Sequence, residues 1–157
     1  MKMRTLAATL ALAPLVACSG AATTSGTTST PAPSGGSDPV VSQLLAAASE
    51  LAGQRGYTPS STRPTTGRLN NGTQQDVNVT LNQGREYLVI GMCDRGCSDV
   101  DLQLFDASGT KVSEDVMDDD VPILEFRAAS SGSYRMRVVM ARCTTEPCAY
   151  GVSVYSK

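Results

Sequence analysis

The chain has 157 residues, with 41% hydrophobic and 18% charged content, and these values are typical of a single modest globular domain. The formal net charge is only −2, whereas nucleic-acid-binding domains need a clustered basic surface, so that class is disfavoured. The sequence has no histidine, which removes the usual general base near neutral pH and the commonest metal ligand. We therefore expect a protein without catalytic activity.

The first seventeen residues have the features of a secretory signal peptide. Lys2 and Arg4 precede an apolar run over 6–16 that is too short to span a bilayer stably. The run ends in Leu-Val-Ala before Cys18, and this sequence resembles the lipobox of bacterial lipoproteins. The resemblance implies that 1–17 is removed and that Cys18 becomes the mature N-terminus, carrying fatty acyl chains such as palmitate. The alternative is an ordinary cleavage site with an incidental cysteine.

Residues 18–37 are expected to form a lipidated, flexible linker. The stretch after Cys18, "SGAATTSGTTSTPAPSGGS", contains neither a bulky apolar side chain nor a charge, so it cannot bury enough surface to offset the entropy of ordering. Ser19 stands where an aspartate would retain a Gram-negative lipoprotein at the inner membrane. We therefore expect a lipid-anchored cell-envelope protein of the outer membrane, facing the periplasm or the cell surface.

An amphipathic helix is predicted over 38–56. Ser37 or Asp38 suits the N-cap, Pro39 suits the first turn, and Gly53 or Gly56 can end the helix. Apolar residues recur at helical spacing at Val40, Val41, Leu44, Leu45, Ala48, Leu51 and Ala52. We expect this stripe to pack on the following domain, because the polar face lacks the basic residues of membrane-surface helices.

From residue 66 the hydrophobic period changes to two, which predicts an all-β domain over 66–157. Strands are expected near 66–69, 74–81, 85–92, 99–106, 111–116, 121–127, 133–142 and 148–155. Inward-facing positions are predicted at Val77, Val79, Leu81, Val100, Leu102, Leu104, Tyr134, Met136, Val138, Met140, Tyr150, Val152 and Val154. Outward-facing positions are predicted at Asp101, Gln103, Arg135, Arg137 and Ser153. This alternation favours a two-layer antiparallel sandwich over a fully buried parallel sheet.

The stretch from about 67 to 155 resembles the bacterial pre-peptidase C-terminal domain family. The resemblance rests on the order "GREYLVIGMC", "DVDLQLFDASGTKV", an acidic loop before "PILEF", "SGSYRMRVVM" and "CAYGVSVY". It implies a jelly-roll-like β-sandwich that serves as a non-catalytic accessory module of secreted peptidases, in some cases binding calcium or matrix polymers. This chain departs from the pattern, because a lipid-anchor signal stands where a peptidase domain would precede the module.

Four cysteines remain if Cys18 carries lipid, and in an oxidising compartment they suggest two disulfides. Of the three pairings we favour Cys93–Cys97 with Cys143–Cys148, because each would close one strand connection. A zinc site of the same four residues has the right ligand number, but it would need reduced thiols outside the cytoplasm. Redox catalysis fits less well, because the Cys-x-x-Cys spacing is missing.

If each strand connection reverses direction, loops 92–98, 117–120 and 142–148 emerge at the same end of the sandwich. The acidic residues of this end are Asp94, Asp99, Asp118, Asp119, Asp120 and Glu146. Carboxylates are ligands that Ca²⁺ takes, so the aspartates are candidate calcium ligands. The alternative is that they keep loops soluble and strand edges unpaired. No EF-hand-like spacing is present.

The sequence therefore predicts a lipid-anchored envelope module that is structural or binds a polysaccharide, a protein or calcium, with no nucleic-acid partner. The expected binding surface is the acidic, disulfide-linked loop end or an open sheet face. The competing interpretation is an accessory factor that assists a secreted hydrolase or peptidase in trans.

Overall fold

A computed structural model describes residues 38–157, so the predicted signal peptide, Cys18 and the linker lie outside the described residues. The elements are α1 (Pro39–Gln54), β1 (Thr58–Pro59), β2 (Thr65–Leu69), β3 (Gln74–Leu81), β4 (Glu86–Cys93), β5 (Cys97–Phe105), β6 (Lys111–Asp115), β7 (Ile123–Arg127), β8 (Gly132–Cys143) and β9 (Cys148–Ser156). The predicted fold class is confirmed: two antiparallel sheets form a sandwich after one helix. No helix within 38–157 is long and apolar enough to cross a membrane.

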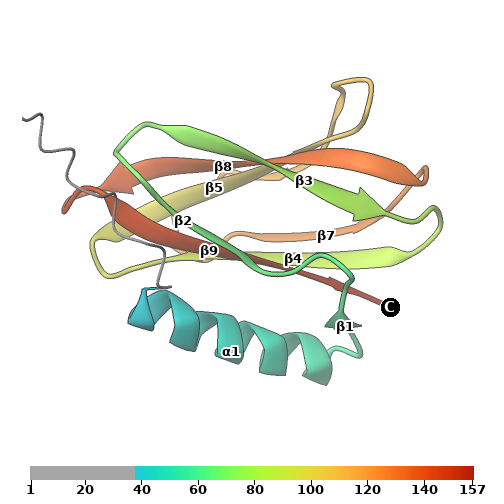
Figure 1. The fold of residues 1–157 in the computed structure, drawn as a ribbon, viewed down its shortest axis with the longest axis horizontal. Helices are drawn as coiled ribbons and strands as arrows, with labels where there is room; N and C mark the ends of the chain where they lie inside the picture. Colours follow the sequence, from blue (N-terminus) through green and yellow to red (C-terminus); the bar gives the residue numbers. More distant parts are fainter. Residues whose placement is uncertain (1–37) are drawn as a thin grey trace, which may run out of the picture. The chain divides into compact units, whose positions relative to one another are not determined.

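The strands form two sheets that lie face to face (Figure 1). In the first, called sheet A, β1 and β2 both pair with β9, which pairs with β4, which pairs with the edge strand β7. In the second, sheet B, the order is β3, β8, β5 and β6. The eight expected strands are all present, with ends displaced by two residues at most. The additional strand β1 consists of two residues, of which Thr58 pairs with Ser156.

The main core lies between the sheets and contains the side chains that the alternating pattern predicts. All of the expected inward residues belong to it, and only Val77 among them is half-buried at its edge. Leu69 and Phe126 also pack against it, and Tyr87 and Phe126 stack with their ring centroids 5.8 Å apart. The period of two places successive side chains on opposite faces, so one face of each sheet supplies this core.

Helix α1 packs on the outer face of sheet A, over β9 and β4, as Figure 1 shows. Val41 packs there with Leu88, Ile90 and Met92 in a second apolar cluster. Strands β4 and β9 are therefore buried on both faces, apart from one half-buried residue at the start of β4. The prediction that Ser153 faces solvent is wrong for this reason: Ser153 is buried although it points away from the main core.

The ends of α1 follow the predicted signals within two residues. Asp38 is the N-cap, and its side chain accepts hydrogen bonds from the amides of Val40 and Val41 at 2.9 and 3.4 Å. Gly56 adopts a positive φ of 80° just beyond the C-cap Arg55, a conformation that glycine tolerates. The helix buries Val41, Ala48 and Ala52, whereas Leu51, expected in the buried stripe, lies on its flank and stays 38% exposed.

Candidate functional site at the disulfide-linked loop end

Two disulfides join the sheets at one end of the sandwich, in the pairing that the sequence predicts. Cys93 at the end of β4 in sheet A bonds to Cys97 at the start of β5 in sheet B. Cys143 at the end of β8 in sheet B bonds to Cys148 at the start of β9 in sheet A. All four sulfurs are thus in disulfides, which removes the zinc alternative. Each short covalent loop stabilises the fold by about 2 kcal/mol in the chain-entropy model.

The loops 94–96 and 144–147 are held together by hydrogen bonds as well as by the disulfides. The Asp94 carboxylate accepts one bond from the Gly96 amide at 3.0 Å and another from the Ala149 amide at 2.7 Å. The Gly96 carbonyl accepts bonds from the amide and the hydroxyl of Thr144 at 2.8 and 2.9 Å. Both carboxylate oxygens of Asp94 are therefore used in fixing the loops. We call this region, with loops 70–73 and 116–122, the disulfide-linked loop end.

Arg68 on β2 connects this end to the beginning of α1. Its guanidinium donates to the Pro147 carbonyl at 3.2 Å and pairs with the Asp38 carboxylate, also at 3.2 Å. The register of β2 against β9 explains this position, because Arg68 lies opposite Ala149. The first described residue of the chain is thus tied to the loop end.

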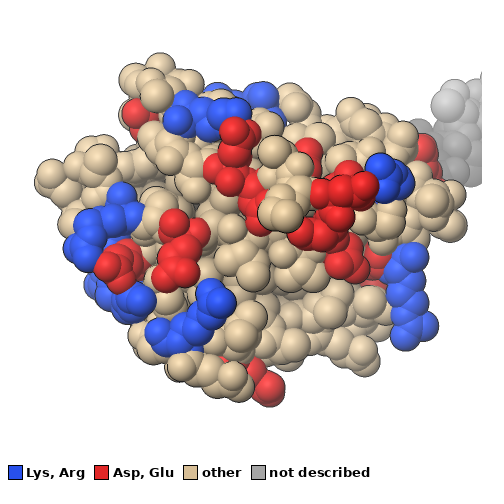
Figure 2. All heavy atoms as spheres, turned by 180° about the vertical axis from the view of Figure 1, so that it is seen from behind, with Lys and Arg blue, Asp and Glu red and all other residues tan. Residues whose placement is uncertain are grey.

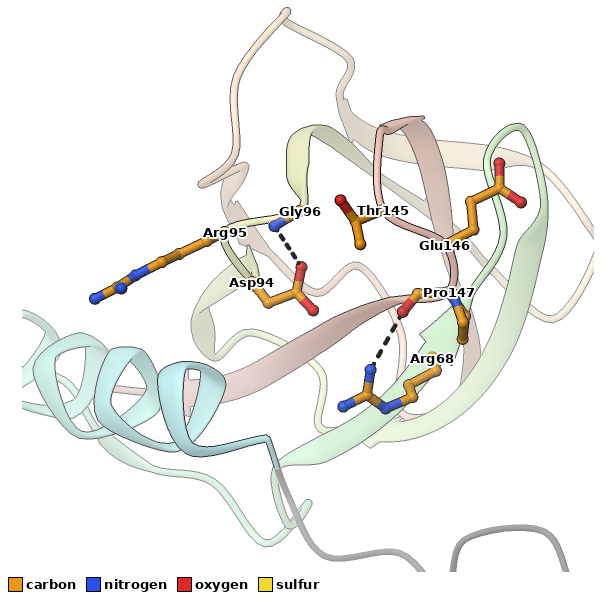
Figure 3. Close-up of a pocket in the computed structure, with 7 residues that line it drawn as sticks. All are labelled: Arg68, Asp94, Arg95, Gly96, Thr145, Glu146 and Pro147. Atoms are coloured by element: carbon orange, nitrogen blue, oxygen red, sulfur yellow. Dashed lines mark hydrogen bonds between the residues drawn. The ribbon is translucent and has the colours of Figure 1, made fainter.

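A hollow of ≈ 430 Å³ lies between these loops (Figure 3). It is lined by Arg68, Asp94, Arg95, Gly96, Thr145, Glu146 and Pro147. Figure 3 shows Arg95 and Glu146 extending to opposite sides of the hollow, away from one another. Within residues 38–157 neither side chain has a salt-bridge partner. The hollow therefore has a cation on one side and a carboxylate on the other, and the folding of the described region uses neither in an ion pair.

The 116–122 loop lies at the same end, as strand parity predicts. The Val100 amide donates to the Asp119 carbonyl at 3.0 Å, and Arg142 pairs with Asp118 at 2.8 Å. Because Val100 and Arg142 belong to β5 and β8, these bonds hold the loop against sheet B.

Asp99 is buried beneath this loop, and its Oδ1 atom has no hydrogen-bond partner among the described residues. Burial raises the pKa of Asp99, and the nearby Asp118 carboxylate raises it further. The positive charge of Arg142 acts in the opposite direction and lowers this pKa. Burial also raises the pKa of Asp101, and Asp99 is the largest of the carboxylates that add to this shift. Carboxylates that shift one another in this way lie close enough to repel.

Of the five candidate calcium ligands, the structure brings Asp99, Asp118 and Asp119 together and leaves Asp94 in a separate hydrogen-bond network. Asp119 Oδ1 already accepts from the Val121 amide at 2.9 Å, and Asp120 is exposed. Within 38–157 no three carboxylates or cysteines are arranged to hold a metal ion. Calcium binding at this end stays a prediction, and calorimetry showing neither heat nor a thermal shift at millimolar calcium would contradict it.

Sequence reasoning missed four side chains that line the hollow: Arg68, Arg95, Thr145 and Pro147. Arg68 comes to this end only through the β2–β9 pairing, which joins positions about eighty residues apart. The chain carries no local signal for that contact. Arg95 and Thr145 could have been found from the cysteine spacing. Arg95 lies between Cys93 and Cys97, and Thr145 lies between Cys143 and Cys148, so each is inside a short loop that a predicted disulfide closes.

The fold places the protein among antiparallel β-sandwich domains, and comparisons with known proteins were made on sequence and structure. No protein-family model and no curated protein matches the sequence. Among solved structures, the pre-peptidase C-terminal domain of a Bacillus anthracis collagenase is similar, with 15% identity over 59% of this chain and 87% of that one and a TM-score of 0.48.

A second similar structure is PliG from Aeromonas hydrophila, a periplasmic inhibitor of g-type lysozyme, with 13% identity, coverage of 60% of this chain and 85% of that one, and a TM-score of 0.45. A protein from Sulfurospirillum deleyianum is similar at 9% identity over 62% of this chain and 99% of that one, with a TM-score of 0.40. These are likenesses of fold.

Proposed function

We propose that the chain is an extracytoplasmic binding module without catalytic activity, attached to the cell envelope through acyl chains on Cys18. Its ligand surface is the part of the disulfide-linked loop end that forms the hollow, and its ligand is an envelope polysaccharide or protein. The compartment is supported by the two disulfides, which persist in oxidising environments. The anchor is supported by the lipobox-like sequence before Cys18.

One observation carries the choice of surface: two loops fixed by disulfides and hydrogen bonds enclose a charged hollow. A fixed loop loses little conformational entropy when a ligand binds, so more of the interaction energy appears as affinity. Arg95 and Glu146 can contact a polar ligand without breaking an ion pair of the described region. The hollow combines polar groups with Pro147, a composition that suits a sugar or a peptide segment.

Site-specific photo-crosslinking in living cells tests this proposal. A photoreactive residue replaces Thr145 at the hollow, and a matched control replaces Ser133. Ser133 is also exposed but lies near the start of β8, the strand whose far end is Cys143. We expect a ligand adduct at 145 and not at 133, and a weaker adduct at 145 when Arg95→Glu is added. An adduct of equal yield at both positions, or no adduct at 145, would contradict the proposed surface. A hydrolase as the adduct would identify the chain as an accessory factor acting in trans.

A further inference from the structure

Several apolar side chains remain exposed near the 116–122 loop. Within that loop Met117 is 70% exposed, Val116 51% and Val121 40%. Leu51 on α1 is 38% exposed, and it lines with Val121 an apolar groove of ≈ 160 Å³ between α1, β4 and the loop. The four exposed side chains belong to neither apolar cluster of the described region, whereas Ala48, Ile90 and Met92 of the second cluster line the groove. Methionine is enriched at protein interfaces, where its flexible side chain adapts to a partner.

Carboxylates border this apolar surface. Asp118 follows Met117 directly, and Asp119 and Asp120 precede Val121. Figure 2 shows acidic side chains gathered in a band across one face of the molecule, with uncharged atoms between them. Arg142 is the only cation paired with an aspartate of this loop among residues 38–157. An apolar surface bordered by negative charge is complementary to an apolar surface bordered by positive charge.

The buried Asp99 carboxylate is the second sign that negative charge exceeds positive charge in this region. Its Oδ1 atom is unpartnered, and the side chain lies under the loop that carries Asp118 and Asp119. Buried polar atoms normally have a partner, so an unpartnered one calls for an explanation. The carboxylates repel one another, and within 38–157 no three of them are arranged to hold a metal ion. Positive charges placed against this surface would relieve that repulsion.

We propose that the 116–122 loop and the adjoining α1 groove form a docking surface for a cationic amphipathic segment of a partner protein. Apolar side chains of that segment contact Met117 and enter the groove beside Leu51 and Val121. Its lysine or arginine side chains lie against Asp118, Asp119 and Asp120. This surface uses none of the residues that line the hollow. The docking surface and the ligand surface at the hollow can therefore be tested independently of one another.

Binding of a synthetic amphipathic peptide, with leucine on one helical face and lysine on the other, tests the proposal on the purified full chain. Fluorescence anisotropy gives the affinity, and NMR shift mapping gives the surface. We expect saturable binding that weakens with added salt, with shifts at 116–122 and along α1. Peptides with glutamate in place of lysine, or serine in place of leucine, should bind far more weakly.

Single substitutions separate this surface from general charge attraction. Met117→Ser and Asp119→Asn should each weaken the affinity by about tenfold, the size expected of a central interface residue. The matched controls are Val112→Ser, an exposed apolar residue on β6, and Glu146→Gln at the hollow; both should leave the affinity unchanged. Equal losses in the controls would overturn the proposal, as would the absence of saturable binding.

Two other occupants would also overturn it. If neutral phosphatidylcholine vesicles bind the chain lacking its acyl groups, and Met117→Ser abolishes that binding while the peptide does not compete, the surface contacts a membrane. If sedimentation shows a dimer that Met117→Ser dissociates, the surface joins two copies of this chain.

Discussion

Gly151 on β9 is where α1 approaches sheet A most closely, and its replacement by alanine tests how the helix is held. A Cβ atom at this position would lie 2.7 Å from Val41 Cγ1 and 3.3 Å from Leu45 Cγ. Val41 is fully buried, so its side chain has little room to turn away from the added methyl group. Overpacking of this kind costs about 1–3 kcal/mol, and removing a glycine from a strand returns about 0.5–1 kcal/mol.

The net expectation for Gly151→Ala is a loss of up to about 2.5 kcal/mol, and each kcal/mol lowers the Tm of a domain of this size by about 4 °C. Urea unfolding of the full chain, monitored by circular dichroism, measures the loss in the free energy of unfolding. The matched control is Gly53→Ala within α1, where nothing lies within 4 Å of the added methyl group. That change should stabilise the protein by up to about 1 kcal/mol, because alanine favours the helix.

A double mutant identifies the cause. Val41→Ala removes the methyl group that the new Cβ would meet, so Gly151→Ala should cost less in that background, with a coupling of at least about 0.5 kcal/mol. Strictly additive effects, or a Gly151→Ala protein more stable than the wild type, would refute the close packing of α1 on β9.

Three further predictions concern charge, disulfides and the anchor. Because burial and Asp118 raise the pKa of Asp99, the folded state binds a proton more tightly than the unfolded state, and the charged carboxylate destabilises the fold above that pKa. Asp99→Asn should therefore raise the urea midpoint at pH 7, with a gain that shrinks near pH 4; a gain independent of pH would contradict this. Replacing Cys143 and Cys148 by serine should lower the free energy of unfolding by about 2 kcal/mol, measured by urea unfolding against the wild type under oxidising and reducing conditions. Cys18→Ala should move the protein from the membrane to the soluble fraction, and unchanged processing and fractionation would exclude the lipid anchor.

Local patterns predicted most of the fold because local chemistry determines it. Alternation along β8 identifies Tyr134, Met136, Val138 and Met140 as core residues, and all four are buried. In the hairpin after β5, Asp106 Oδ1 accepts from the amides of Ser108 and Thr110, so the turn between the two predicted strands is held by local hydrogen bonds. Strand β1 was missed because a strand of two residues, one of them Pro59, is too short to show an alternation of apolar and polar side chains.

The failures come from contacts between distant positions. Ser153 alternates like an outward residue, and only the position of α1 over β9 makes it buried. Arg135 and Arg137 lie on the outward face as predicted, but the sequence did not predict that both pair with Asp76 on the neighbouring β3, at 3.0 and 2.8 Å. The Asp76 carboxyl keeps a pKa below its usual range chiefly because Arg137 donates a hydrogen bond to it. Such partners depend on strand order, which hydrophobic periodicity does not determine.

Both sulfur bridges cross from one sheet to the other at the end where the chain enters the domain. Together they supply about 4 kcal/mol, against a total of about 5–15 kcal/mol for a typical domain. A newly made chain in a reducing cytosol lacks that contribution, and its two layers are then joined at this end by hydrogen bonds and packing alone. Full stability is therefore reached only when both disulfides have formed, which an oxidising environment favours.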